Sequence, residues 1–180
     1  MKALLVIDVQ NGIVNAGDFE EEISLMEQVI KDFKIKELPV IFMKHLDEAE
    51  ENPLHKDSEG SDLHPSLKDY ADIVIEKKTP NSFYETDLQS QLDSLEVDHL
   101  FITGFNTEFC CMFTAITGFD RGYKVTFIED ATGTVNTDET YEMPELDIRD
   151  FVGTVLHWSN VIEVVDVDEY GEYYDSEVNE

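Results

Sequence analysis

The chain has 180 residues, 42% of them hydrophobic, which predicts one domain with a full core. Its 12 basic and 41 acidic side chains give a formal net charge of −29. Such a surface repels nucleic acid and anionic lipid, so we expect neither as a partner. No apolar run approaches the ~20 residues that span a bilayer, no signal peptide precedes the first strand-like run, and two adjacent cysteines make no disulfide framework, so we expect a cytoplasmic protein.

The first half of the chain alternates between predicted strands and a predicted helix. The continuous apolar run at 3–7 is typical of a strand that is buried on both faces of a parallel sheet, and Asp8 follows it directly. Apolar side chains at helical spacing predict an amphipathic helix over 19–33. Shorter apolar runs at 40–43 and 73–75 predict the next two strands.

The second half continues this alternation. Leucines at helical spacing within 88–95 predict a helix, and apolar runs at 100–102 and 124–128 predict two further strands. Pro144 can open a last helix, and residues 161–164 are expected to form a short final strand. Helices therefore separate most of the predicted strands.

Such alternation is typical of a mainly parallel sheet with helices on both faces and right-handed crossovers. We predict an α/β fold with three αβα layers around a six-stranded, Rossmann-like sheet. Residues 1–165 are expected to form this domain. Residues 166–180 are acidic and contain no basic side chain, which is typical of a solvated, partly disordered tail.

The strand at 100–102 leads into a helix start, a position that suits a nucleophilic cysteine. Thr107 can cap the following helix, because its hydroxyl can accept from the free amides of the first turn. Cys110 then falls in that turn, where the unpaired amides and the helix dipole favour a thiolate. The alternative, slightly favoured on this stretch alone, is that Cys110 and Cys111 are two inert, buried apolar residues.

Three reactive side chains follow predicted strands: Asp8, Lys77 and Cys110. Parallel strands end at one edge of a sheet, where ligands bind in open α/β folds, so we expect the three to converge there. A cysteine nucleophile needs a base for its proton and a cation for its charge, and this set supplies both. Loop lysines are usually only solvated, and the neighbouring Lys78 leaves the choice of lysine open on chemistry alone.

Four motifs carry a resemblance to a known family: LLVIDVQNG at 4–12, VIEKKTPNSFYETDL at 74–88, ITGFNTEFCCMFTA at 102–115 and GYKVTFIEDAT at 122–132. With them the chain resembles the isochorismatase-like cysteine hydrolase superfamily, which includes nicotinamidases, N-carbamoyl amidohydrolases and isochorismatase. The resemblance implies an enzyme that cleaves a C–N bond, other than a peptide bond, in a small amide or carbamoyl substrate.

The resemblance also implies residue roles. Cys110 attacks the carbonyl carbon and forms a covalent acyl-enzyme, Asp8 acts as general base and then general acid, and Lys77 stabilises charge. Lys77 is preferred over Lys78 because the family's lysine stands six positions before a phenylalanine, here Phe83.

The same resemblance implies a cis peptide bond between Phe105 and Asn106. This bond would turn the amide of Asn106 toward the oxyanion, beside the amide of Cys110, to form an oxyanion hole. Five side chains are predicted to line the substrate pocket: Gln10, His45, Phe83, Tyr84 and Phe109.

We predict neither a metal nor another cofactor. Nicotinamidases resemble this chain but build a metal site on an Asp-x-His pattern, whereas His45 and Asp47 stand in the opposite order here. Neither His55 nor His64 completes a recognised zinc spacing. The lack of a metal pattern counts against nicotinamidase proper. The presence of Cys110 counts against isochorismatase itself, which cleaves a vinyl ether without a nucleophilic cysteine.

Three other functions compete with this interpretation. The first is a binding or regulatory domain that kept the fold and lost activity. The second is a phosphoacceptor receiver domain, but that would need an aspartate after the third strand, where Glu76 and Lys77 stand. The third is redox chemistry at the adjacent cysteines, which we rank last because a disulfide between neighbours is strained.

We also predict a homo-oligomer, a dimer or a tetramer. The family commonly assembles, and the helix after Cys110 is rich in apolar side chains: Met112, Phe113, Ile116 and Phe119. The high negative charge opposes association at low salt.

Overall fold

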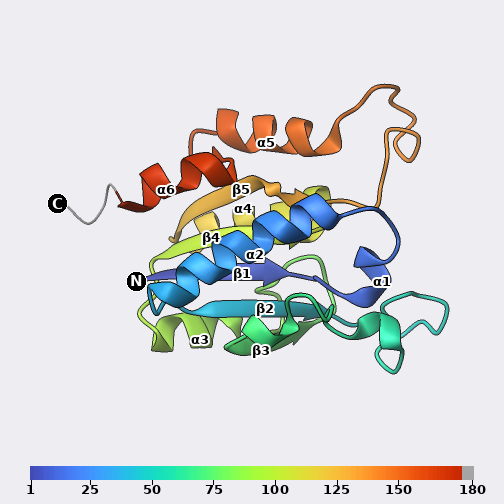
Figure 1. Ribbon diagram of the computed structural model, residues 1–180, viewed down its shortest axis with the longest axis horizontal. Coiled ribbons are helices and arrows are strands. Elements are labelled where there is room, and N and C mark those ends of the chain that lie inside the picture. Colours follow the sequence, from blue (N-terminus) through green and yellow to red (C-terminus); the bar gives the residue numbers. More distant parts are fainter. Residues whose placement is uncertain (176–180) are drawn as a thin grey trace.

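The computed structural model describes residues 1–175 and has one parallel sheet of six strands in the order β3-β2-β1-β4-β5-β6 (Figure 1). The strands are β1 Lys2–Ile7, β2 Val40–His45, β3 Ile73–Lys77, β4 His99–Phe105, β5 Lys124–Gly133 and β6 Glu163–Val165. The predicted α/β fold class with a six-stranded sheet is confirmed. The strand order reverses direction between β1 and β4, and in open α/β sheets that reversal opens a crevice for ligands.

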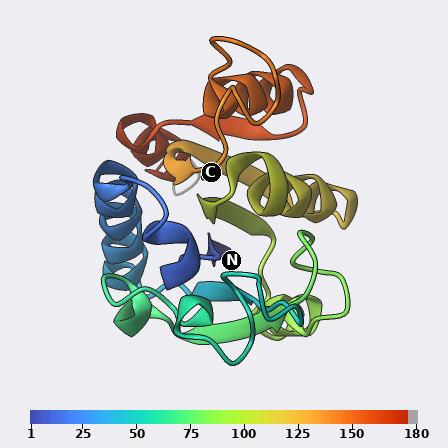
Figure 2. The same cartoon turned by 90° about the vertical axis from the view of Figure 1, so that its right-hand side faces the viewer.

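Helices cover both faces of the sheet, as the views in Figures 1 and 2 show. They are α1 Asn11–Val14, α2 Glu20–Ile35, α3 Leu88–Ser94, α4 Met112–Asp120, α5 Ile148–Trp158 and α6 Val167–Asp175, with 3₁₀ turns at Glu59–Ser61 and Lys68–Tyr70. Helices α2 and α6 share one hydrophobic core, and α3, α4 and α5 share the other.

The apolar runs form strands because the sheet is buried on both faces. Along β1, Leu5 and Ile7 pack into the core under α3, α4 and α5, and the alternating Leu4 and Val6 pack into the core under α2. This alternation is the period of two that a strand imposes. A continuous apolar run therefore supplies both cores at once.

Three expectations about helix ends and the C-terminal segment are wrong. Thr107 does not cap a helix, because it is the first residue of a π-helical turn whose N-cap is Asn106, and its hydroxyl donates to the Thr132 hydroxyl at 2.9 Å. Helix α5 starts at Ile148 rather than at Pro144, and the Asp147 side chain caps it. The segment after 165 is not a solvated tail throughout.

Helix α6 covers much of the predicted tail. Val167 and Tyr170 are buried in the core with α2, and the Tyr170 hydroxyl donates to Asp32 at 2.5 Å. Packing of these two side chains outweighs the acidic composition around them. Residues 176–180 lie outside the described part, and the predicted boundary after 165 stays a prediction. In the described residues, none of the helices is long and apolar enough to cross a membrane.

Strand β5 continues past its predicted end at 128 to Gly133. It carries Glu129 and Asp130, which are only partly exposed. Burial, followed by the charges of Asp166 and Asp150, raises the pKa of Glu129 to about 7. Burial also raises the pKa of Asp130 to about 6.

Glu129 should make the fold more stable at mildly acidic pH. Its folded-state pKa lies above the ordinary glutamate value of 4.5, so the folded state binds an extra proton between these values. This contribution is complete below the ordinary value and is lost as the pH rises through about 7. Glu129→Gln should therefore raise the melting temperature at about pH 8 and have less effect at about pH 5. Thermal unfolding followed by circular dichroism checks this, and equal pH profiles for both proteins would contradict it.

Gly104 in β4 is a second test of the fold. Its φ is +117°, and a methyl group there would overlap the backbone of Ile7 in the neighbouring β1. Gly104→Ala should lower the free energy of unfolding by about 2 kcal/mol or more, measured by urea titration. Gly122→Ala is the matched control, because Gly122 also has a positive φ of +93° but open space around it. The control should cost only about 1 kcal/mol, and equal losses would count against a steric role for Gly104.

Candidate active site

Asp8 lies directly after β1, at the edge of the sheet where the strand order reverses. It has a positive φ of 52°, and its amide donates to the carbonyl of Met43 at the end of β2. The side chain is buried. Its Oδ2 accepts from Lys77 Nζ at 2.7 Å, while the buried Oδ1 has no hydrogen-bond partner. Asp8 thus presents one oxygen that can still accept a proton.

Lys77 is the last residue of β3 rather than part of the following loop, and its side chain is 0% exposed. Its ammonium contacts Asp8 Oδ2, His45 Nδ1 at 3.1 Å and the Thr79 carbonyl at 3.2 Å. Burial by itself would lower the pKa of Lys77, but the charges of Asp8 and Cys110 raise it overall. Lys77 therefore stays a cation. Lys78 points elsewhere and pairs with Glu48 at 2.7 Å.

Cys110 lies in a π-helical turn, Thr107–Cys111, between β4 and α4. It is 8% exposed, whereas Cys111 is fully buried. Burial, aided by the charge of Asp8, raises the pKa of the Cys110 thiol to about 12, and Lys77 offsets only part of this. The expectation of a readily ionised thiol is wrong. Cys110 rests as a thiol and needs a base to become a nucleophile.

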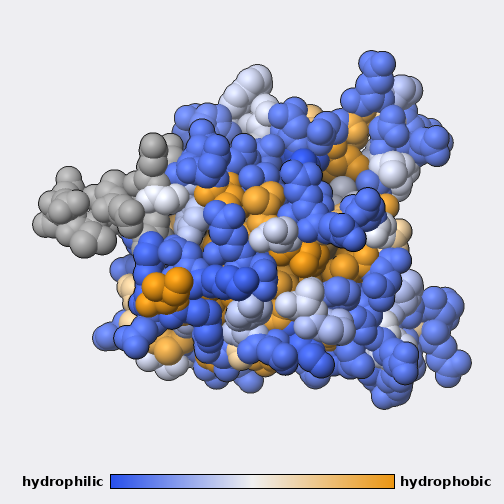
Figure 3. Space-filling view, viewed as in Figure 1, coloured by the Kyte–Doolittle hydropathy of each residue, from blue (hydrophilic) through white to orange (hydrophobic). Residues whose placement is uncertain are grey.

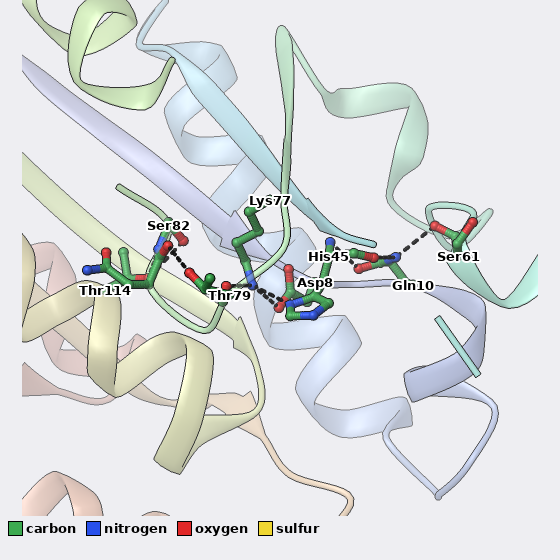
Figure 4. A network of polar contacts seen from close by, with 9 residues as sticks. Asp8, Gln10, His45, Ser61, Lys77, Thr79, Ser82 and Thr114 are labelled. Atoms are coloured by element: carbon green, nitrogen blue, oxygen red, sulfur yellow. Dashed lines mark hydrogen bonds and ion pairs between the residues drawn. The ribbon is translucent and has the colours of Figure 1, made fainter. Parts of the chain in front are cut away.

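The structure brings these side chains together from four strand ends, as the close view in Figure 4 shows for Asp8, Lys77 and His45. Asp8, His45 and Cys110 each offer an atom, and the three atoms lie within 4.8 Å of one another. The ammonium of Lys77 contacts Asp8 and His45 in the same cluster. A base, a cation and a thiol are thus within reach of one small reacting group.

The backbone ahead of Cys110 turns sharply. The peptide bond between Phe105 and Asn106 is cis. The Asn106 carbonyl accepts from the amides of Phe109 and Cys111, and its side-chain oxygen accepts from the amide of Val135. Asn106 is therefore held from both sides. The oxyanion hole at the amides of Asn106 and Cys110 stays a prediction.

Gln10 and Phe83 do not line a substrate pocket. The Gln10 amide is buried and donates to the carbonyls of His45 and Ser61, while its oxygen accepts from the His45 amide, so it ties β1, β2 and the loop 46–70 together. The Phe83 ring is buried in the core. It stacks on Tyr123 at 6.0 Å, toward the carboxyl end of α4, away from the end near Cys110. Both interpretations as pocket residues are wrong.

Tyr84 and Phe109 are partly exposed but face different hollows. Tyr84 lines a cavity of about 350 Å³ together with Leu46, Lys77, Lys78 and Thr79. Phe109 lines an apolar groove of about 390 Å³ between α4 and α5. Of the five predicted pocket residues, His45 is the one whose side chain is hydrogen-bonded to the Lys77 ammonium within the described residues.

Sequence reasoning missed Glu108, which is buried next to the nucleophile turn. Its Oε1 accepts from Thr134 at 2.9 Å, Asn136 at 2.6 Å and Tyr141 at 3.0 Å. The carboxylate therefore fastens the segment 134–141 to the turn that carries Cys110. Its position inside the motif was visible in the sequence, but its three partners lie more than 25 residues away and have no local signal.

The residues do not fit a nicotinamidase-type metal site. The Asp47 oxygens accept from the Ala49 amide and the Asn52 side chain, and His64 Nδ1 pairs with the Ser66 hydroxyl. The cluster of Asp8, His45 and Cys110 could offer three ligand atoms. However, the ammonium of Lys77 already contacts two of these residues, and it would repel a divalent cation at that point.

Comparisons with known proteins show the family to which the chain belongs. The domain family described as "Isochorismatase domain" matches residues 2–159. The chain is 30% identical over 139 residues to the isochorismatase family protein YddQ of Bacillus subtilis. The aligned region covers 73% of this chain and 77% of that protein. It is 27% identical over 159 residues to nicotinamidase 3 of Arabidopsis thaliana, covering 76% of this chain and 75% of that protein. A crystal structure from Burkholderia xenovorans that carries the isochorismatase name superposes with a TM-score of 0.85 at 29% identity, over 94% of this chain and 85% of that one.

Proposed function

Because the chain belongs to the isochorismatase family, we propose that it is a cysteine hydrolase that cleaves the C–N bond of a small amide or carbamoyl substrate. The observation that carries the proposal is the buried Asp8–Lys77 pair beside the Cys110 thiol. The similarity to a protein named nicotinamidase supports an amide as substrate.

In the first half of the proposed reaction, Asp8 takes the thiol proton while the sulfur of Cys110 attacks the carbonyl carbon. The new S–C bond turns the carbonyl oxygen into an oxyanion. Asp8 then gives its proton to the leaving nitrogen, the C–N bond breaks, and a thioester and an amine remain. The unpartnered Oδ1 of Asp8 suits this transfer.

In the second half, Asp8 removes a proton from water as the water oxygen attacks the thioester. The S–C bond then breaks, and the proton passes from Asp8 to the departing thiolate, which restores the resting thiol. Lys77 stays protonated and offsets the negative charge that moves between Asp8 and Cys110. The amides of Asn106 and Cys110 are proposed to hold the oxyanion, a contact whose loss typically slows such reactions by about 10²–10³-fold.

An ammonia-release screen tests the proposal. The screen covers primary amides, ureides and carbamoyl amino acids, with the Cys110→Ala protein as the blank. Release that depends on Cys110 supports the hydrolase. A complete screen without Cys110-dependent release would exclude this function for these classes.

A reducing compartment suits this chemistry, since both cysteines are free and one has to remain a thiol. We therefore propose a cytoplasmic location. The family-matched residues 2–159 lie within the proposed domain of residues 1–165.

We propose that the protein is a dimer or a tetramer. Large apolar side chains are exposed along the π-helical turn, α4 and α5: Phe109, Phe113, Ile116, Phe119, Phe151, Val155 and Trp158. Water-exposed apolar surface of this kind favours association. Light scattering at moderate salt should show the oligomer, and a monomer at both low and moderate salt would contradict it.

A pair of variants makes the oligomer prediction specific to α4. Phe113→Glu should shift the protein toward monomer, because it places a charge in the proposed interface. Ile35→Glu is the control, since Ile35 is 80% exposed on α2, away from α4. Equal molar masses of the two variants in light scattering would mean that the interface does not include α4.

A further inference from the structure

The ammonium of Lys77 has no hydrogen left for a substrate. A protonated lysine carries three N–H donors. In Lys77 they meet Asp8, His45 and the Thr79 carbonyl. The side chain is fully buried, and Asp8 balances its charge. A substrate carboxylate therefore finds no partner in this lysine.

The arginines, which recognise carboxylates best, lie elsewhere. Arg121 lies over the Phe83 ring at 4.9 Å and donates to Gln89. Arg149 pairs with Glu22 at 3.3 Å. The face seen in Figure 3 is mostly hydrophilic, and the formal charge of −29 repels anions from the whole surface.

His45 supplies an uncharged hydrogen-bond donor instead. Its Nδ1 faces Lys77 Nζ at 3.1 Å, and an ammonium can only donate, so Nδ1 has to accept and the ring proton sits on Nε2. Burial, followed by the charge of Lys77, lowers the pKa of His45 and keeps the ring neutral. The ring is only half-buried and lies beside Asp8 and Lys77 (Figure 4), in the same cluster as Cys110.

We infer that the site takes uncharged amides, that Nε2 of His45 donates a hydrogen bond to an acceptor atom of the substrate, and that amides carrying a carboxylate are rejected. The inference rests on the proposed hydrolase function and names its substrate class. Burying a charge without a partner costs far more than burying a neutral group that is hydrogen-bonded. Because the charge of Lys77 is already balanced by Asp8, a buried anion would lack a counter-ion here, and the site therefore favours neutral substrates.

Matched substrate pairs test the charge selection. We would compare 3-acetylbenzamide with 3-carbamoylbenzoate, and N,N-dimethylsuccinamide with succinamate, by ammonia release. Within each pair the shape is similar and only one member is an anion. The neutral member should have the higher kcat/KM by about 10- to 100-fold. Equal or better turnover of the anions, still dependent on Cys110, would overturn the inference and leave the hydrolase function intact.

Calorimetry with the Cys110→Ala protein gives a readout that needs no turnover. The neutral members should bind and the anions should not. Tighter binding of the anions, or no binding of any neutral member, overturns the inference. If no compound in the ammonia-release screen shows Cys110-dependent turnover, the proposed hydrolase function itself is wrong for these substrate classes.

Two variants of His45 test its role. His45→Asn keeps an acceptor for Lys77 but cannot reach the substrate with a donor, whereas the longer side chain in His45→Gln places an amide N–H near the former Nε2. The asparagine variant should raise KM for the neutral amides by about tenfold with a smaller change in kcat. The glutamine variant should raise KM less, because its amide N–H replaces part of the lost hydrogen bond. An unchanged KM in the asparagine variant overturns the donor role.

Discussion

Cys110→Ala is expected to reduce amide hydrolysis by at least about 10⁴-fold, because the proposed acyl-enzyme cannot form without the sulfur. Binding of the substrate should survive, since alanine leaves the Asp8–Lys77 pair in place. Initial rates of ammonia release measure the effect. A loss of less than about tenfold would mean that another residue carries the chemistry.

Cys111→Ala is the matched control, because Cys111 is the next residue but faces the core. It should keep most of the activity and lose about 1–2 kcal/mol of stability from the removed sulfur. Peptide mapping after iodoacetamide treatment separates the two thiols further. Cys110 should react first, and faster with rising pH because its pKa is about 12. Earlier labelling of Cys111, whose pKa full burial raises well above the ordinary thiol value, would contradict the assignment.

The sheet was predictable from sequence because strands buried on both faces leave continuous apolar runs. The strand ends were less predictable. Strand β5 runs on past the polar residues Glu129 and Asp130, because its pairing with β4 resumes at Thr132 and Gly133 after an irregularity in the register. Thr107 has the right side chain for a cap, but it lies one residue past the N-cap position, inside the π-helical turn.

The convergence of Asp8, Lys77 and Cys110 was also predictable, because parallel strands end at a common edge. The behaviour of the thiol was not. The pKa of Cys110 depends on how deeply the turn is packed, and burial outweighs the nearby cation there. The identity of an aromatic residue likewise does not tell which way its side chain points. For this reason Phe83 was predicted to line the substrate pocket, although its ring lies in the hydrophobic core.

The buried ion pair between Asp8 and Lys77 carries the second large prediction. Asp8→Asn should abolish the activity, because an amide cannot take the thiol proton. It should also lower the free energy of unfolding by about 3–5 kcal/mol, since Lys77 is then a buried cation without its counter-ion. Lys77→Met should cost a similar amount by isolating Asp8. Urea titrations at neutral pH give both values.

The double variant Asp8→Asn/Lys77→Met distinguishes a coupled pair from two independent residues. It removes both charges together, so its loss should be clearly smaller than the sum of the single losses. It should nevertheless remain inactive, because neither proton transfer nor charge compensation is restored. Additive losses in the double variant would mean that the 2.7 Å contact contributes little, and that the two side chains matter for the fold separately.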